Sequence, residues 1–382
     1  MLKRNIYLLW GIALLQGMVF YGPVATLYRQ AAGLGIFSIT LIESISLWLT
    51  ICLEIPWGWL ADRIGYRRTM LGCCFLYFVS KLVFWQADGF PGFLLERTLL
   101  SVVCAGLSGV DSGMLYLSCV EGESHGVFSI YETLGQLGML AAAGIYALWI
   151  GENYRLAAFL TVLSYGLAAV LSLGLKEVTP LSGPGATSKN RLLVLKGQLG
   201  NPKVLLLLLA VGLLNECHQT ITVFLSQLQY VRAGMNHHEI TLAYIVTNLA
   251  ALAGGFSAFF CGKTGPKSMG TGLLVMAAFS CMILGLFPTP VLSVLAVVLL
   301  RLCFSLMQPL HIQLQNEQIT GRDRATALSM NAVIMESLGI FLNLLFGALA
   351  DFRLDAAMLL GAVLCAAGAV LYCLSFSGKA TS

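Results

Sequence analysis

The chain has 382 residues, of which 58% are hydrophobic and only 10% are charged, and its formal net charge is +4. Soluble domains carry about 25% charged residues, and a chain this apolar could not cover its own exterior in water. These values exclude an ordinary soluble protein, and the small net charge gives no indication of a nucleic-acid partner. The solvent around most of the chain is therefore expected to be a lipid bilayer.

Twelve apolar runs are long enough to cross a bilayer, because a spanning helix needs roughly 20 residues. They lie at 6–28, 38–61, 69–87, 89–117, 124–149 and 155–175, and again at 204–228, 238–261, 268–287, 290–317, 325–350 and 356–376. The one long polar stretch separates the two sets and contains Pro180 and Pro184, as a linker would. The sequence predicts an all-α integral membrane protein with a six-helix bundle at 1–175, a cytoplasmic linker at 176–203 and a second six-helix bundle at 204–382.

The lysines and arginines indicate how the spans are oriented. With both termini on the cytoplasmic side, fifteen of the 22 basic residues fall on that side and five on the other, which is the asymmetry of the positive-inside rule. Lys3 and Arg4 precede an apolar run that is too long for a cleaved signal peptide. We expect a multi-pass protein of a prokaryotic cell membrane with both termini cytoplasmic. The eleven cysteines lack the spacing of zinc ligands, so no metal site is expected.

The two sets of spans carry related sequence. Residues 32–40 and 233–241 share an Ala-Gly pair and an Ile-Thr pair at the same spacing, at an offset of 201. Arg97 and Glu132 recur as Arg301 and Glu336, both at an offset of 204. Because each half contains an even number of spans, both copies run in the same direction. This predicts a parallel repeat about an axis along the membrane normal.

The loop after the second span contains a motif. Residues 58–68 read GWLADRIGYRR, and a degenerate copy follows the eighth span at 262–267. Arg97 lies early in the fourth span, and Asp111 follows fourteen residues later. The loop resembles the G-x-L-A-D-R-x-G-R-[KR] signature of the major facilitator superfamily, with Tyr66 where that family often has arginine. The fourth span, with Arg97 early in the helix, is similar to a second sequence pattern of the same family.

This resemblance implies the twelve-helix major facilitator fold and secondary active transport of a small molecule by alternating access. The chain looks most like the small twelve-span, proton-coupled exporters of drugs and metabolites, although its fifth span lacks the Gly-Pro signature of that branch. The resemblance further implies a monomer that is not an enzyme, binds no cofactor and uses a proton gradient. Its expected partners are a small-molecule substrate and the bilayer.

The resemblance also assigns roles within the loop. In the family, the carboxylate at the position of Asp62 caps the amino end of span eleven, where the helix dipole favours negative charge, and this contact holds the outward-open state together. Arg63 and Arg67 are expected to complete a charge cluster with Asp111, unless the basic residues only anchor the loop to anionic lipid. The expected gating residues are Gly58, Asp62, Arg63, Gly65, Arg67 and Asp111.

Ionisable side chains within spans are costly in hydrocarbon, so each is a candidate functional group. We expect Arg97 to pair with Glu132, and Arg301 with Glu336 at the repeated position. Each pair either cements two neighbouring helices or opens so that its carboxylate can exchange a proton.

Glu216 in the seventh span has only His218 nearby as a basic residue, and it is the first candidate for the coupling proton. The alternative is a hydrated carboxylate near the inner end of the helix. His311 is a further candidate, and Glu43 and Glu54 in the second span are weaker ones. Spans one, four, seven and ten line the cavity in this family, which suggests substrate contacts from Gln16, Tyr21, Tyr28, Arg29, Asn215, Gln219 and Gln308.

Three functions are compatible with these features. The first is proton-coupled export of a small amphipathic molecule across the cell membrane. The second is an uptake symporter or facilitator for a polar or anionic nutrient, which the intramembrane arginines could serve. The third is a membrane sensor that does not transport, against which the intact loop at 58–68 argues.

Overall fold

The computed structural model describes residues 3–119, 124–178, 201–318 and 324–377. Within these ranges the regular structure is helical, and twelve helices are long and apolar enough to cross a membrane. The predicted all-α fold with twelve spans is confirmed, and each span lies within a few residues of its expected position. Residues 179–200, most of the expected linker, lie outside the described part of the chain, so the predicted domain boundaries stay a prediction.

The first six spans are built, in chain order, from α1 (Lys3–Gly17), the 3-10 helix η1 (Gly22–Val24), α2 (Ala25–Ala31), α3 (Ile36–Ile64), α4 (Tyr66–Gln86), α5 (Gly89–Leu107), α6 (Val110–Ser118), α7 (Ser124–Ile145), the π-helical segment η2 (Tyr146–Ile150) and α8 (Tyr154–Ser172). α1, η1 and α2 together form the first span, and α5 and α6 form the fourth.

The second six spans are built from α10 (Pro202–Gln219), the π-helical segment η3 (Thr220–Leu225), α11 (Ser226–Arg232), α12 (His237–Ala250), the 3-10 helix η4 (Ala251–Phe256), α13 (Ser257–Thr264), α14 (Pro266–Leu286), α15 (Pro290–Gln318), α16 (Arg324–Phe352) and α17 (Leu354–Ser375). α10, η3 and α11 form the seventh span, which is interrupted in its middle as the first span is.

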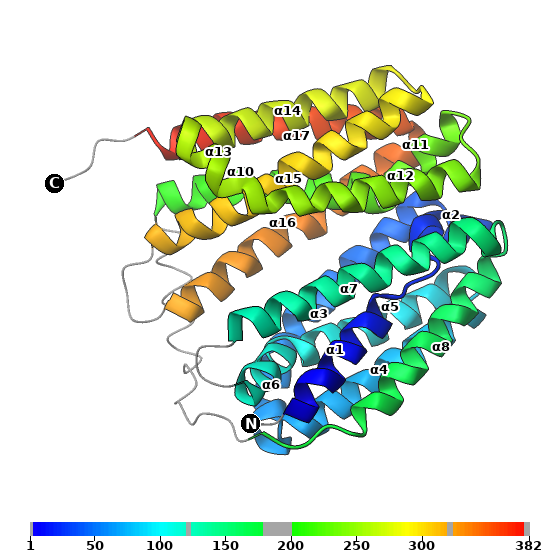
Figure 1. Cartoon of the computed structure of the whole chain (residues 1–382). Helices are drawn as coiled ribbons and strands as arrows, with labels where there is room; N and C mark the ends of the chain where they lie inside the picture. Colours follow the sequence, from blue (N-terminus) through cyan, green and yellow to red (C-terminus); the bar gives the residue numbers. More distant parts are fainter. Residues whose placement is uncertain (1–2, 120–123, 179–200, 319–323, 378–382) are drawn as a thin grey trace. The chain divides into compact units, whose positions relative to one another are not determined.

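The helices gather into two compact units, Met1–Gly183 with His237–Ile245, and Pro184–Asn236 with Val246–Ser382. In the first unit α1 packs on α7 and α8, and α4 packs on α5 and α8. In the second unit the equivalent helices make the equivalent contacts, because α10 packs on α16 and α17, and α14 packs on α15 and α17 (Figure 1). The repeated set of helix pairs agrees with the parallel repeat that the sequence predicts.

The turn between α3 and α4 and its repeat between α13 and α14 share a backbone conformation. Gly65 has a φ angle of +91°, and Gly265 has a φ angle of +80°. Glycine adopts such angles readily because it has no Cβ. In both units this residue lets one helix end and the next begin directly after it. The degenerate copy of the motif therefore keeps the residue that the turn requires.

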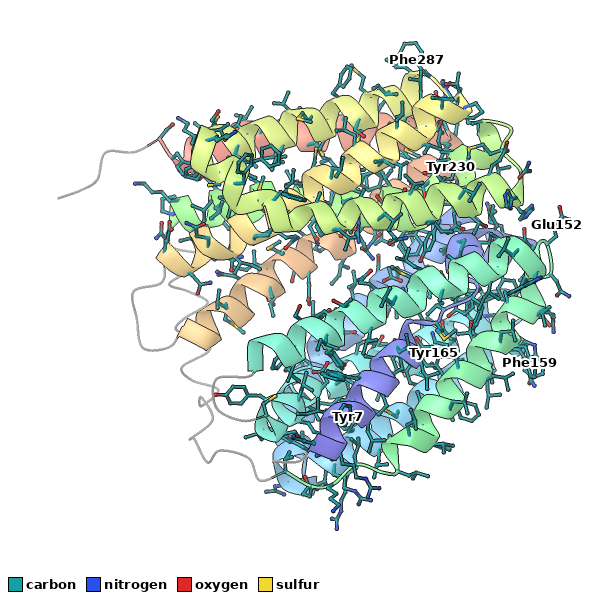
Figure 2. The ribbon with its side chains drawn as sticks, viewed as in Figure 1. Tyr7, Glu152, Phe159, Tyr165, Tyr230 and Phe287 are labelled. Atoms are coloured by element: carbon teal, nitrogen blue, oxygen red, sulfur yellow. The ribbon has the colours of Figure 1, made fainter. Side chains whose placement is uncertain are left out.

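The outer surfaces of both units are apolar, as lipid-facing surfaces must be. Leu167 of α8 and Val363 of α17 are among many exposed aliphatic side chains. Figure 2 shows Tyr7 and Phe287, which are exposed near the ends of their helices. Aromatic side chains are enriched where the hydrocarbon meets the headgroups. This distribution supports the assignment of the twelve helices to a membrane.

The α1–α7 contact depends on glycines. A Cβ added to Gly138 would collide with the backbone carbonyl of Leu14, and one added to Gly17 would collide with the carbonyl of Gly135. Small residues at a helix–helix contact let two backbones approach closely, and membrane helices commonly associate in this way.

Gly138→Val is expected to destabilise the first unit, because overpacking a close contact costs roughly 1–3 kcal/mol. Gly144→Val on the same helix is the matched control, since a Cβ there meets nothing within 4 Å. Thermal unfolding of the purified full-length protein in detergent measures both variants. Equal unfolding temperatures for the two would contradict the close packing of α1 against α7.

Candidate functional site

Five ionisable side chains meet inside the first unit, and we call them the N-terminal charge cluster: Arg29, Glu43, Lys81, Glu96 and Arg97. The Lys81 ammonium lies 3.3 Å from a carboxylate oxygen of Glu96. The Arg97 Nε donates to Glu43 Oε2 over 2.8 Å, and its Nη2 contacts the same oxygen. The Lys81–Glu96 pair is deeply buried, whereas the Arg97 and Glu43 side chains keep 19% and 12% of their surface accessible.

Aromatic rings surround Lys81. Its Nζ donates to the hydroxyl of Tyr21 over 3.1 Å and lies 5.3 and 5.4 Å from the ring centroids of Tyr77 and Tyr165. Figure 2 labels Tyr165, which comes from α8. A cation over an aromatic face is attracted by the ring quadrupole, and the attraction grows when water is excluded. The rings and the Glu96 carboxylate together stabilise an ammonium within a span.

Arg29 is the third cation of the cluster and is only 7% exposed. Its guanidinium lies 5.7 and 6.0 Å from the ring centroids of Phe84 and Phe93. It is close enough to Arg97, Glu96 and Glu43 to interact with them electrostatically. Among the described residues, its buried Nε has no hydrogen-bond partner, and neither has Oε2 of Glu96. The cluster therefore holds three cations against two carboxylates, with the Nε donor of Arg29 left over.

The N-terminal charge cluster lies toward one end of the bundle. Arg29 is two residues from the end of α2, and Lys81 is five residues from the end of α4. Glu43 and Arg97 are each seven or eight residues inside the start of their helices. At 1.5 Å per residue the cluster lies within roughly 12 Å of those helix ends. The lysine and arginine distribution predicts that this end is external.

The expected pairing of Arg97 with Glu132 is wrong. Arg97 binds Glu43 instead, and Glu132 is exposed on α7. The reason is packing, because α5 contacts α3 and α4, whereas α7 packs on α1. The fourth and fifth spans are consecutive in the sequence, but their charged faces do not meet. Glu43, which the sequence marked as a weak candidate, supplies the carboxylate.

In the second unit, Arg301 of α15 lies against His218 of α10. The Arg301 Nη1 is 3.0 Å from His218 Nε2, and the imidazole stacks on Phe304 with ring centroids 3.9 Å apart and planes within 3°. Arginine can only donate, so this geometry makes Nε2 of His218 the acceptor and places the imidazole proton on Nδ1. His218 is thus engaged by Arg301. The expected pairing of Arg301 with Glu336, which is exposed on α16, stays a prediction.

Glu216 is buried where α10 gives way to the π-helical segment η3. The Thr220 hydroxyl lies 2.8 Å from a carboxylate oxygen of Glu216 and 3.0 Å from the side-chain oxygen of Asn343 on α16. A hydroxyl has one proton, so it donates to one of these oxygens at a time. Segments of π-helix inside longer helices occur frequently at functional sites. Glu216, Thr220 and Asn343 form a polar chain between two spans.

His311 belongs to a second polar group of the same unit. It is buried on α15 and contacts the Gln315 amide one turn later, and the Asn331 amide of α16 donates to Gln315 Oε1 over 3.3 Å. The group consists of neutral hydrogen-bonding side chains. It gives α15 a polar face.

The remaining cavity candidates lie on helices of one unit or the other, and their contact with a substrate stays a prediction. Gln16 is 3.6 Å from the Cys74 sulfur, and Tyr28 donates to the carbonyl of Trp85 over 3.3 Å. Asn215 and Gln308 are half-buried, and Gln219 is exposed.

The α3–α4 turn contains the motif at 58–68, and a residue outside the motif contacts it. The Glu177 carboxylate accepts a hydrogen bond from the backbone N–H of Arg67 over 3.0 Å, at the amino end of α4 where the helix dipole favours negative charge. A Cβ on Gly65 would lie 2.8 Å from a Glu177 oxygen, so glycine also leaves room for this contact. The sequence places Glu177 only within the predicted linker at 176–203.

One expectation about the motif has a definite outcome. The Arg67–Asp111 link is wrong, because the Arg67 Nε donates to the Leu175 carbonyl over 2.6 Å and Asp111 accepts from the Ser112 N–H of its own helix. Arg63 is exposed. Gly58 and the Asp62 side chain lie outside the described part of the chain, so the capping role of Asp62 stays a prediction.

Lys81, Glu96 and Glu177 are the residues that sequence reasoning left without a role. Lys81 and Glu96 stand inside apolar runs, so the cost of burying charge could have marked both as candidates. Their pairing depends on how α4 and α5 are rotated against each other. No spacing in the sequence gives that rotation.

Lys81→Met is expected to lower the free energy of unfolding by about 3–5 kcal/mol, because it leaves the Glu96 carboxylate buried without its cation. The double variant Lys81→Met/Glu96→Leu removes both charges and should recover most of that loss. Arg155→Gln is the control, since the Arg155–Asp88 pair is exposed. Thermal unfolding of the full-length protein measures all three. A double variant no more stable than Lys81→Met would contradict the pairing.

The family model described as Major Facilitator Superfamily matches residues 8–343. An uncharacterized MFS-type transporter of Methanocaldococcus jannaschii is 28% identical over 142 residues, which are 35% of this chain and 36% of that protein. The chain thus matches about a third of the length of this relative.

Solved structures of transporters share the fold over nearly the whole chain. The nucleoside transporter NupG superposes with a TM-score of 0.83 at 15% identity, covering 98% of this chain and 100% of that one. A bacterial homolog of the human lysosomal transporter Spinster gives 0.79 at 14% identity, over 98% and 97%. A POT family transporter in complex with 5-aminolevulinic acid gives 0.73 at 14% identity, over 99% and 95%. Together with the family match and the twelve spans, these likenesses lead to one conclusion: the chain belongs to the major facilitator superfamily and is a secondary transporter, not an enzyme.

Proposed function

We propose that this transporter moves a small organic molecule that carries a negatively charged group, and that its transport is coupled to protons. The observation that carries the proposal is the composition of the N-terminal charge cluster. Three cations face two carboxylates there. The Arg29 guanidinium is buried, and its Nε donates no hydrogen bond to any described residue.

A buried cation is stable only when an anion or several acceptors compensate it. Lys81 and Arg97 each form an ion pair with a carboxylate, whereas no such pair of Arg29 occurs among the described residues, and the faces of two phenylalanine rings lie at its side. A carboxylate or phosphate on the substrate would supply the missing negative charge. The planar guanidinium can bind either group through two parallel hydrogen bonds. This favours a polar or anionic substrate over a purely amphipathic one.

The coupling proton is assigned in this proposal to Glu216. The Glu216 carboxylate accepts from a hydroxyl that can serve both of its protonation states. When Glu216 is ionised, Thr220 donates to it. When Glu216 is protonated, the new O–H donates to Thr220, and the Thr220 proton turns to the Asn343 oxygen. Protonation thus changes the hydrogen bond between η3 and α16.

Export of an amphipathic compound is the second candidate function. It is supported by the motif at 58–68, which resembles that of the drug and metabolite exporters. In this alternative Arg29 serves only the stability of the first unit.

The test is transport by the purified protein in proteoliposomes under an imposed proton gradient. Small carboxylates and phosphates are offered beside their neutral esters and beside cationic amphiphiles, in both gradient directions. We expect accumulation of an anionic compound and not of its neutral ester. Glu216→Gln is expected to reduce gradient-driven accumulation by about tenfold or more while exchange without a gradient persists, because the variant cannot carry the proton.

Glu152→Gln is the matched control, since Glu152 is an exposed carboxylate in the turn before α8. Gradient dependence that is unchanged in Glu216→Gln would exclude Glu216 as the proton carrier. Accumulation of amphiphiles with no uptake or release of anions would favour the exporter and overturn the anionic substrate.

A further inference from the structure

An apolar groove runs along the outer surface of the first unit between α4 and α8. Its volume is about 840 Å³, and its walls include Phe75, Phe78, Leu167 and Val170. Two glycines open it. A Cβ on Gly72 would meet nothing within 4 Å. A Cβ on Gly166, the second glycine, would lie 3.1 Å from the Phe78 ring, so a larger residue would fill the floor of the groove.

The groove faces hydrocarbon. Phe75, Leu167 and Val170 are exposed although they lie in spans. Along α8 the lining extends from Val162 to Leu173, a length of roughly 16 Å at 1.5 Å per residue. That is about half of the 30 Å hydrocarbon core. The groove therefore matches the depth of one lipid leaflet.

Basic side chains stand at the end where the groove closes. The lining occupies the second to fourth turns of α4 and the last turns of α8, so on α4 it ends six residues from Gly65, on the side of the Gly65 turn. Arg68 and Lys176 are exposed there. A Cβ on Gly174 would lie 3.3 Å from a guanidinium nitrogen of Arg4, which places a third cation beside the same end. Glu177 also lies at this end, where it caps α4.

A second groove occurs in the second unit, lined by the α13–α14 turn at 264–268, by the first turns of α14 and by the end of α17 at Cys373 and Phe376. Its volume is about 730 Å³, and Gly272 lies in its wall as Gly72 lies in the first, at an offset of 200. A Cβ on Gly272 would also meet nothing within 4 Å. Lys267 lines this groove, and it corresponds to Arg67 at the same offset. Both copies of the repeat thus have an open glycine in the groove wall and a basic residue five positions before it.

We propose that each groove binds an acyl chain of an anionic phospholipid, whose phosphate lies against the basic side chains at the end of the groove. The lysine and arginine distribution predicts that this end faces the cytoplasmic leaflet, where anionic lipids attract clustered basic residues. Charge and shape agree on this occupant. The apolar walls contact the acyl chain, and the absence of a Cβ at Gly72 and Gly272 leaves space for it. The basic side chains bind the headgroup phosphate.

The test is lipid binding by the full-length protein, delipidated in detergent and observed by native mass spectrometry. Phosphatidylglycerol and phosphatidylcholine with the same oleoyl chains are added in turn. We expect two phosphatidylglycerol molecules to bind per chain, in preference to phosphatidylcholine by about fivefold or more. Gly72→Phe should remove one of the two, and Gly72→Phe/Gly272→Phe should remove both.

Gly144→Phe is the matched control, since Gly144 is an equally open glycine on α7. Arg68→Gln/Lys176→Gln should lower the preference for phosphatidylglycerol at the first groove while leaving its walls intact. This variant changes exposed residues, so it keeps the test valid if a phenylalanine variant fails to fold. Equal binding of the two lipids by the unaltered protein would overturn the proposal. So would unchanged lipid counts in the phenylalanine variants, or a dimer that Gly72→Phe converts to a monomer.

Discussion

The cost of charge in hydrocarbon is the constraint on which the inside of this transporter depends. A lone ion in a span is expensive, so each must find its partner within the helices that pack around it. In the first unit Lys81 and Arg97 meet this requirement through Glu96 and Glu43. These pairs link α4 to α5 and α3 to α5, and the same helices also pack extensively against each other. Arg29 is the exception, and an exception inside a span is where function is most expected.

The two units share their helix contacts but not the chemistry of their interiors. α1 packs on α7 and α8, and α10 packs on α16 and α17, which are the equivalent helices of the second unit. Both spans are interrupted near their middle. Among the described residues, the interior of the first unit contains two ion pairs and a surplus cation. The second contains neutral amides, two imidazoles and the Glu216–Thr220–Asn343 chain, with Arg301 against His218. Duplication explains the common frame. The divergence of the interiors is consistent with a division of labour, in which one unit binds charge on the substrate and the other responds to protons.

The fold could be predicted from the sequence because each span depends only on the composition of its own segment. The turn at Gly65 could also be predicted, since its motif is local. The partners of charged side chains could not, because they depend on how each helix is rotated about its axis. Arg97 illustrates this, since the sequence predicts a partner at Glu132 on the neighbouring span and Glu43 of α3 supplies it. Arg67 repeats the lesson, because a backbone carbonyl at Leu175 takes the place of Asp111. A single sequence records the cost of a buried charge but not the neighbour that compensates it.

The central claim is that the first unit needs an anion beside Arg29. Ligand-induced stabilisation measures this most directly, because a ligand that binds the folded state at a hundred times its Kd adds about 2.7 kcal/mol to its stability. The unfolding temperature of the full-length protein is measured with small carboxylates and phosphates and with their neutral esters, for the unaltered chain, for Arg29→Gln and for the exposed control Arg155→Gln. The account predicts that at least one anion raises the unfolding temperature by several degrees, that its neutral ester does not, and that only Arg29→Gln loses the effect. Stabilisation by neutral esters as large as that by the anions, or an anion effect that survives in Arg29→Gln, would contradict it.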